Sequence, residues 1–410
     1  MRTLNFPLYF FFLLATVIFI SCGKENDNSE WPGWRGPNRD GVVKNFQSPE
    51  EWPAELTKVW TQSVGLCDAS PVLADGRIYL HVKQNENEVT LCLDAETGAE
   101  IWSTVNNVSP EVTGGAAPHP GPRSTPYVSG GKVYTLGVGG SLNCLNAKTG
   151  ELIWKNNEYT EVPDFFVGMS PLVTDGKCIV HLGGKNGSIV AFNAGAGEKM
   201  WTIDGEPATY SSPVLMKIGN EKVITVQTET DLLGVSLDGA VLWRIPTPGE
   251  RRFYNSSTPI VDGQHIFVAG QGVGTKSFKI EKSGDEYTWT ENWHNPEFGV
   301  SFNTPVLKDG FLYAHEGRLG KLFCLNAATG ETAWADTIAH NRFVSTLDLG
   351  NEILSLTGKG DILVYEPNPE KYVEKAVYKV SATDVYAHPL VFGKRIYTKD
   401  KENLTCWEVQ

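Results

Sequence analysis

The sequence predicts an all-β fold, an eight-bladed β-propeller over residues 55–410, and three observations lead to it. A turn-and-strand unit with a fixed four-residue offset from glycine to tryptophan recurs along the chain. Seven tryptophans follow one another at intervals of 41 to 52 residues, which is the length of one four-stranded blade. The 410 residues include 42 Gly, 12 Trp and 14 Tyr, a composition that favours turns and strands over a helical bundle.

The recurrent unit reads Asp-Ala-Glu-Thr-Gly-Ala-Glu-Ile-Trp at residues 94–102. It returns with the same spacing at residues 146–154, 193–201 and 326–334, and with a shortened turn at residues 238–243. Asp or Asn caps a tight turn through its side chain, and glycine accepts the positive φ that other residues resist. Each unit therefore predicts a turn and then a strand whose tryptophan fills the gap between two packed sheets.

A second pattern precedes each unit and predicts the inner hairpin of a blade. It begins with Ser or Thr followed by Pro, and continues as an apolar run, a glycine turn and another apolar run, as in residues 70–79. An Asp-Gly pair between two apolar runs is a strong hairpin signal, so each blade is expected to hold four short antiparallel strands. The other Ser/Thr-Pro pairs begin at Thr125, Ser170, Ser212, Thr258 and Thr304.

The two ends of the propeller region are predicted to complete one blade together. Tyr378 takes the tryptophan position in a degenerate blade over residues 343–380, and the piece that starts at His388 then supplies three strands without a tryptophan strand. Residues 56–64, around Trp60, are a tryptophan strand without the preceding three. Joining the N-terminal strand to the C-terminal blade closes the ring, gives eight blades and leaves no open edge.

Three short regions precede the propeller. Residues 1–21 resemble a bacterial lipoprotein signal peptide, because an apolar run ends in Ser-Cys at Cys22; an ordinary secretory signal with an incidental cysteine is the alternative. Residues 22–30 are expected to form a flexible tether. Residues 31–54 are expected to be a leader that packs on one face of the propeller, with a partner-docking peptide as the alternative. Lipid attachment at Cys22, followed by Gly23, favours the outer membrane, at its periplasmic face or at the cell surface.

The Ala-x-x-Gly-x-x-x-Trp repeat resembles that of the pyrroloquinoline-quinone-like (PQQ-like) eight-bladed propeller superfamily. That superfamily includes both quinoprotein alcohol dehydrogenases and the BamB lipoproteins of outer-membrane assembly. The resemblance to BamB implies a non-catalytic envelope lipoprotein, a scaffold that binds envelope proteins or peptides. The alternative that it implies is a PQQ-dependent, alcohol-dehydrogenase-like oxidoreductase. The net charge of −13 argues against nucleic acid as a partner.

PQQ with calcium is expected only under that alternative, and no catalytic, cofactor-binding or metal-binding residues are predicted. Quinoprotein dehydrogenases are known to hold the quinone with a floor tryptophan and a disulfide between adjacent cysteines, whereas this chain has no Cys-Cys dipeptide. Calcium prefers six to eight oxygen ligands, and few acidic residues enter the inner strands. No short spacing typical of a metal site joins the histidines His119, His181, His265, His315 and His388.

The cysteines are expected to be buried and mostly unpaired. Four of them occupy the same strand position in different blades, which is too far apart for a bridge. A bridge between Cys67 and Cys178 is left open. The four equivalent cysteines are Cys92, Cys144, Cys324 and Cys406.

The segments that lead into the innermost strands should line the mouth of the central channel, and they are rich in aromatic and polar residues. Such a lining suits a small-molecule pocket or a protein-binding hot spot. The alternative is that the aromatic rings simply plug the funnel while hydroxyl groups bind the backbone. The candidate mouth residues are His119, Arg123, Phe166, Tyr210, Tyr254, Asn255, Phe302, Asn303, Arg342, Tyr386 and His388.

Overall fold

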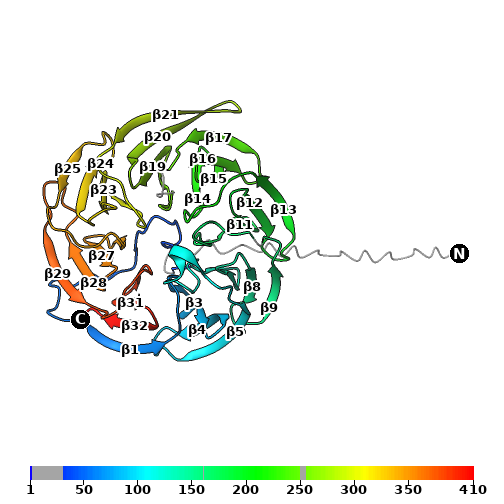
Figure 1. Ribbon diagram of the computed structural model, residues 1–410, viewed down its shortest axis with the longest axis horizontal. Coiled ribbons are helices and arrows are strands. Elements are labelled where there is room, and N and C mark those ends of the chain that lie inside the picture. Colours follow the sequence, from blue (N-terminus) through cyan, green and yellow to red (C-terminus); the bar gives the residue numbers. More distant parts are fainter. Residues whose placement is uncertain (2–30, 160, 250–254) are drawn as a thin grey trace.

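Eight four-stranded antiparallel sheets surround a central axis in the computed structural model, which describes Met1 and residues 31–159, 161–249 and 255–410 (Figure 1). The eight-bladed propeller predicted from the repeats is therefore confirmed. The signal peptide at 1–21, Cys22, the tether at 22–30 and Tyr254 lie outside the described residues. No helix in the described ranges is long and apolar enough to cross a membrane.

The strands of each blade follow one another from the axis outward. Blades 1 and 2 contain β2 (Val72–Ala74), β3 (Arg77–Gln84), β4 (Asn87–Asp94), β5 (Glu100–Val108), and β6 (Tyr127–Ser129), β7 (Lys132–Leu136), β8 (Leu142–Asn146), β9 (Leu152–Asn156). Blades 3 and 4 contain β10 (Leu172–Thr174), β11 (Lys177–Leu182), β12 (Ser188–Asn193), β13 (Lys199–Asp204), and β14 (Val214–Ile218), β15 (Glu221–Gln227), β16 (Asp231–Ser236), β17 (Val241–Pro246).

The second half of the chain repeats this order. Blades 5 and 6 contain β18 (Ile260–Asp262), β19 (His265–Gly270), β20 (Gly274–Ser283), β21 (Glu286–Asn295), and β22 (Val306–Lys308), β23 (Phe311–His315), β24 (Leu322–Asn326), β25 (Thr332–Ala335). Blade 7 contains β26 (Val344–Asp348), β27 (Ile353–Thr357), β28 (Asp361–Tyr365) and β29 (Glu374–Lys379). One short 3₁₀ helix, η1 (Gly114–Ala116), lies between blades 1 and 2.

The eighth blade joins the two ends of the propeller. Its three inner strands are β30 (Leu390–Phe392), β31 (Arg395–Lys399) and β32 (Asn403–Glu408), and β1 (Thr57–Ser63) is the outermost strand. β1 pairs antiparallel with β32, so that Trp60 lies opposite Cys406. In Figure 1 the blue β1 lies beside the red β32, as the sequence predicted. The pairing leaves no open sheet edge at the seam.

The repeated tryptophans dock each blade onto the next one. The Trp102 indole Nε1 donates a hydrogen bond of 3.1 Å to the Ala147 carbonyl oxygen, and Trp154 does the same to Ala194. Equivalent bonds link Trp60, Trp201, Trp293 and Trp334 to a carbonyl of the following blade. For five of these six tryptophans, all except Trp334, the indole ring also lies against the glycine of the next turn. A Cβ on Gly98, for example, would come within 2.7 Å of the Trp60 ring. The recurrent glycine therefore serves both the turn and the packing.

Two blades depart from this docking scheme. Trp243 faces the long β20–β21 hairpin of blade 5 instead of a short turn, and its Nε1 has no hydrogen-bond partner among the described residues. In blade 7 the Tyr378 hydroxyl donates to the Pro53 carbonyl oxygen at 2.7 Å. The degenerate blade therefore docks onto the leader.

The Ser/Thr-Pro pairs form a second set of links between blades, close to the axis. In six cases a backbone N–H at the start of one inner strand donates to the hydroxyl of the equivalent Ser or Thr in the neighbouring blade, at 2.9–3.3 Å. The chain of bonds runs from His388 through Ser70, Thr125, Ser170, Ser212 and Thr258 to Thr304. Ser or Thr recurs here because its short side chain supplies the acceptor that the neighbouring N–H needs.

The six cysteines in the described part of the chain are free and buried. Cys92, Cys144, Cys324 and Cys406 occupy the third strand of their blades, as predicted, and Cys67 and Cys178 are not bridged to each other. Burial raises the pKa of the Cys92 thiol to about 11. These side chains therefore act as small apolar core groups.

We expect Gly98→Ala to destabilise the protein more than Gly76→Ala does. Both glycines have positive φ, 72° and 68°, so each substitution costs about 1–2 kcal/mol of backbone strain. A Cβ at Gly98 would also clash with the Trp60 ring, whereas a Cβ at Gly76 would have no atom within 4 Å. The clash should therefore cost Gly98→Ala about 1–3 kcal/mol of further stability. Urea unfolding measures both; equal losses would contradict tryptophan docking on the glycine.

Candidate functional site

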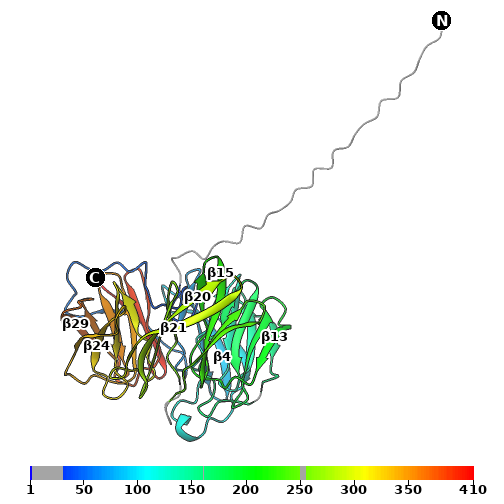
Figure 2. The same cartoon turned by 90° about the horizontal axis from the view of Figure 1, so that it is seen from above.

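The leader enters the central channel, beyond the expected packing on one face. Trp31 forms a β-bridge with Leu73 of the innermost strand of blade 1, and Val42 forms one with Asp348 of blade 7. Further along, Phe46 bridges to Gly393 and stacks on Trp52. The leader therefore fills the axis with residues 31–41 and then continues across one face of the ring. We call this the back face; Figure 2 shows it opposite the face that carries η1.

Two arginines fix the leader inside the channel. Arg35 donates to the carbonyl oxygens of Thr304, Pro305 and Thr346, at 3.1, 2.8 and 3.2 Å. Its side chain is fully enclosed, with 1% of its surface exposed. Burial lowers its pKa to about 10, so the guanidinium stays charged at neutral pH. The carbonyl dipoles of two blades therefore stabilise a buried cation on the axis.

Arg39 makes the equivalent contacts on another side of the channel. It donates to the carbonyl oxygens of Ser170 at 3.2 Å, Pro213 at 2.9 Å and Pro171. Burial lowers its pKa to about 10 as well. Together the two arginines contact blades 3, 4, 6 and 7. Two side chains four residues apart in the leader therefore link inner strands that lie far apart in the sequence.

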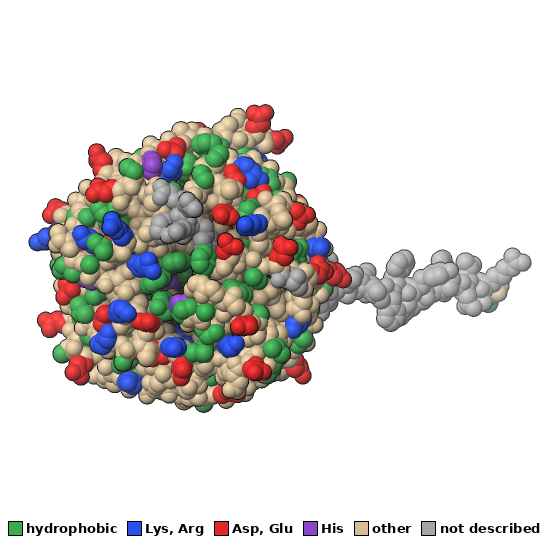
Figure 3. Space-filling model, in the orientation of Figure 1, with side chains coloured by type: hydrophobic (Ala, Val, Ile, Leu, Met, Phe, Trp, Pro, Cys, Tyr) green, Lys and Arg blue, Asp and Glu red, His purple; other side chains and the backbone are tan. Residues whose placement is uncertain are grey.

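The plugged channel leaves a cavity of about 350 Å³ at the face that carries η1, which we call the mouth face. Trp34 of the leader lines the cavity; its Nε1 donates to the Thr258 hydroxyl at 3.1 Å, and its ring meets His388 edge-on at 4.4 Å. In Figure 3, which views this face, hydrophobic side chains gather around its centre. Six predicted residues line the same cavity: His119, Arg123, Tyr210, Phe302, Arg342 and Tyr386.

The carboxylate of the cavity lining has an ion-pair partner, whereas one arginine nitrogen has no hydrogen-bond partner among the described residues. Arg123 Nη2 donates to the His119 carbonyl oxygen at 2.7 Å, whereas its buried Nη1 has no hydrogen-bond partner in the described part of the chain. The guanidinium of Arg342 lies 4.8 Å from the centre of the Phe343 ring. Asp68 is the single carboxylate of the described lining, and it lies 2.7 Å from His119 Nδ1. The described lining therefore contains two arginine guanidinium groups and one carboxylate, which is already paired with His119.

Aromatic rings form the rest of the wall. Phe302 and Phe343 stack at 5.2 Å with an interplanar angle of 20°, and Tyr386 meets Phe343 edge-on at 5.2 Å. Tyr210 donates from its hydroxyl to the Phe165 carbonyl oxygen at 2.5 Å. Phe302 and Phe165 still expose 46% and 38% of their surface. The rings are held by one another and yet remain accessible.

Four other predicted residues have structural roles near the mouth. Phe166 adopts a positive φ of 65° and packs beside η1, while Asn255 donates to the Thr228 and Thr247 carbonyl oxygens and lines a separate cavity. Asn303 is buried and donates to the His315 carbonyl oxygen at 3.0 Å. His388 is buried behind Trp34, and burial holds its pKa well below the usual value.

The lining also contains residues that are absent from the predicted set, among them Phe165, Phe343, Trp34, Asp68 and Gln271. Asp68 stands two residues before the Ser70-Pro71 pair, so the register of the repeat would have found it. Gln271 lies in the β19–β20 turn, a class of loop that also reaches this face. Trp34 belongs to the leader, which shares no repeat with the blades, so its position in the channel had no signal.

The described residues do not fit a calcium–quinone site. They contain no cluster of three or more His, Cys, Asp or Glu side chains that could hold a metal ion. Calcium prefers six to eight oxygen ligands, several of them carboxylates, and the described lining supplies one carboxylate, Asp68. His181 and His315 are buried, and their ring nitrogens form hydrogen bonds of 2.8 and 3.0 Å with the carbonyl oxygens of Glu206 and Gly320, so these two histidines have structural roles.

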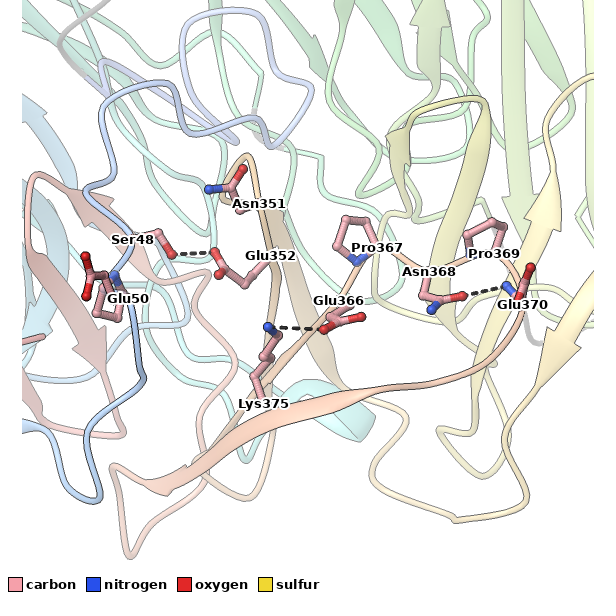
Figure 4. A pocket seen from close by; sticks show the side chains of 11 residues that line it. Ser48, Glu50, Asn351, Glu352, Glu366, Pro367, Asn368, Pro369, Glu370 and Lys375 are labelled. Carbon is pink, nitrogen blue, oxygen red and sulfur yellow. Dashed lines mark hydrogen bonds and ion pairs between the residues drawn. The ribbon is translucent and has the colours of Figure 1, made fainter.

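A second, wider cavity of about 840 Å³ lies on the back face, where the leader crosses blade 7 (Figure 4). Its polar groups pair with one another: the Ser48 hydroxyl donates to Glu352 Oε2 at 2.6 Å, and Lys375 lies 3.1 Å from Glu366. Figure 4 shows these pairs across the opening. We assign this cavity to leader attachment.

Comparison with known proteins gives relatives of two kinds. A family model described as "Outer membrane protein assembly factor BamB" matches residues 85–336. The outer membrane protein assembly factor BamB of Shewanella oneidensis is 23% identical over 269 residues, which cover 59% of this chain and 65% of that protein. The quinohemoprotein alcohol dehydrogenase ADH IIB of Pseudomonas putida is 29% identical over 307 residues, 66% of this chain but 42% of that enzyme. The chain thus spans less than two thirds of either relative.

Solved structures of both kinds of relative, BamB and quinohemoprotein alcohol dehydrogenase, have the same fold as this chain. BamB from Moraxella catarrhalis has a TM-score of 0.64 at 14% identity, and the match covers 86% of this chain and 99% of that one. The quinohemoprotein alcohol dehydrogenase from Comamonas testosteroni has a TM-score of 0.71 at 15% identity, covering 93% and 80%. At such identities the likeness establishes the propeller fold and leaves the activity to the site.

We expect Arg39→Ala to lower the free energy of unfolding by about 3 kcal/mol or more, because three buried carbonyl oxygens lose their donor. Lys44→Ala removes the same charge from an exposed position of the leader and should change stability by less than about 0.5 kcal/mol. Guanidinium unfolding of both variants measures the difference. A loss at Lys44 equal to that at Arg39 would mean that charge alone holds the leader.

Proposed function

Because the chain belongs to the PQQ-like propeller family of outer membrane protein assembly factor BamB, we propose that it is a non-catalytic scaffold of the cell envelope. It binds a protein or peptide partner at the mouth face. Lipid attachment at Cys22 anchors it to the outer membrane, and the tether at 22–30 separates the anchor from the ring. A family role in assembling outer membrane proteins is the finer form of this proposal.

The observation that carries the proposal is the cavity that the leader closes, with accessible aromatic rings at its rim. Protein-binding hot spots are enriched in aromatic residues and arginine, set in pockets that exclude water. Phe302 and Phe165 are exposed beside Arg123 and Arg342, and this combination matches such a hot spot. Further apolar side chains, Leu319 and Ile338, are exposed in nearby loops. These features support a partner larger than the cavity itself.

The second candidate, a PQQ-dependent oxidoreductase, has one observation in its favour. The indole of Trp34 lines the axial cavity, and quinoprotein dehydrogenases place a tryptophan under the quinone. Two observations on the described residues stand against it: the cavity lining contains one carboxylate, Asp68, and the described cysteines are not bridged. We therefore favour the scaffold and derive no reaction step from the cavity.

Affinity purification of the tagged full chain from gently solubilised membranes tests the scaffold. We expect one or a few envelope proteins to be recovered reproducibly, and Phe302→Ser to reduce their recovery at least fivefold, roughly a 1 kcal/mol loss, because it removes an exposed anchor ring. Trp289→Ser is the matched control, since Trp289 is 41% exposed on β21, away from the mouth. Recovery of no reproducible partner, or equal loss in both variants, would count against the proposal.

Incubation of the purified protein with PQQ and calcium tests the second candidate. We expect no bound quinone in the absorbance spectrum after gel filtration and no dye-linked oxidation of alcohols, because the described lining offers calcium one carboxylate, Asp68. Stoichiometric quinone absorbance together with alcohol oxidation would replace the scaffold with the enzyme.

A further inference from the structure

We infer that the axial cavity binds the C-terminal end of a peptide, with the terminal carboxylate at Arg123 and Arg342 and the last side chain against Phe302 and Phe343. The inference rests on the proposed function, because it names the part of the partner that the mouth face holds. It is argued from the unpaired groups of the cavity, from its shape and from its walls.

The unpaired cationic groups call for an anion. Arg123 Nη1 is buried without a hydrogen-bond partner among the described residues, and the same residues supply no carboxylate within ion-pair distance of Arg123 or Arg342. Asp68, the one acidic group of the described lining, is engaged by His119 at 2.7 Å. A carboxylate matches the planar fork of a guanidinium and forms strong, charge-assisted hydrogen bonds with it.

An unpaired acceptor calls for an N–H group on the same ligand. The side-chain oxygen of Gln271 is buried in the lining and has no hydrogen-bond partner in the described ranges. Its amide can present either its oxygen or its nitrogen to the cavity, so it suits a peptide group, which offers both a donor and an acceptor. A carboxylate together with a peptide group is the chemistry of a chain terminus.

The shape of the cavity favours a chain end over an internal loop. Its volume of about 350 Å³ lies at the low end of the roughly 300–1,000 Å³ of small-ligand sites. Trp34 and the arginines of the leader fill the channel behind it, so a peptide that enters has no exit on the back face. The end of a peptide can enter a cavity closed at one end as a single length of chain. An internal segment would have to enter and leave through the same opening, so two lengths of chain would have to fit there.

The walls favour an apolar last residue. Phe302 and Phe343 are stacked, and Tyr386 packs edge-on against Phe343. These rings lie next to Arg342, whose guanidinium covers the Phe343 face. The exposed part of Phe302 and Phe165 then remains to contact the residues before the terminus. The arginines give the cavity a local charge that is opposite in sign to the net charge of −13 of the whole protein.

Fluorescence anisotropy with a labelled peptide tests the inference on the full chain. The probe is an N-terminally labelled hexapeptide that ends in leucine with a free carboxylate. The same peptide with an amidated C-terminus should bind at least about tenfold more weakly, because it loses the charge-assisted bonds. An amidated peptide with an internal glutamate should also bind weakly, and N-acetylleucine should compete only at much higher concentration than the unlabelled hexapeptide.

Three variants locate the binding. Arg123→Gln and Arg342→Gln should each weaken the free-acid peptide at least about tenfold and leave the weak binding of the amidated peptide unchanged. Arg318→Gln is the matched control, because Arg318 is exposed in the β23–β24 turn and does not line the cavity. Thermal unfolding confirms that each variant is folded. Arg342 is exposed, so its substitution tests the site even where Arg123→Gln does not fold.

Several outcomes overturn the inference: equal binding of the free-acid and amidated peptides, tight binding of the internal-glutamate peptide, no binding of any peptide, or no effect of the two cavity variants. Its failure differs from that of the proposed function. A partner that is recovered from membranes and lost with Phe302→Ser, while peptides show no carboxylate preference, leaves the scaffold intact and removes only the terminus. If peptide binding depends on the carboxylate but no partner is recovered from membranes, the inference about the terminus stands and the proposed scaffold function fails.

Discussion

The contacts of Arg35 and Arg39 with the carbonyl oxygens of the inner strands hold the centre of this molecule together. A propeller of repeated blades brings together a ring of backbone oxygens that point towards the axis, and without a donor each of them would be buried and unsatisfied. The two guanidinium groups of the leader supply donors to six of these oxygens, in blades 3, 4, 6 and 7. The shape of the axial cavity follows from this, because the same segment places Trp34 at its inner end.

The repeat of the sequence accounts for nearly all of the fold. Glycine and tryptophan keep a constant offset because the ring of one blade packs on the glycine of the next, as Trp60 does on Gly98. Because this contact recurs in successive blades, it produces the same sequence pattern each time. The number of blades and the closure of the ring could therefore be predicted. The leader makes each of its contacts once. In the sequence alone, Arg35 therefore looks like any other charged residue.

The candidate site shows the same division. His119, Arg123 and Phe302 precede Ser/Thr-Pro pairs, so their register in the blade is enough to predict a place at the mouth of the channel. Register does not say which way a side chain turns. Phe166 and Asn303 also precede Ser/Thr-Pro pairs, and yet Phe166 packs beside η1 and Asn303 donates to the His315 carbonyl oxygen, because local backbone geometry and neighbouring loops decide the direction.

The pairing of β1 with β32 has a consequence for how the chain reaches its native state. The outer strand of the last blade lies near the start of the chain, and the leader before it ends up enclosed by blades that are synthesised later. Contacts of such large sequence separation form late and slow down folding. The Arg35 contacts with Thr304 and Thr346 can therefore form only after blades 6 and 7 have been synthesised, so the centre of the ring is completed late in folding.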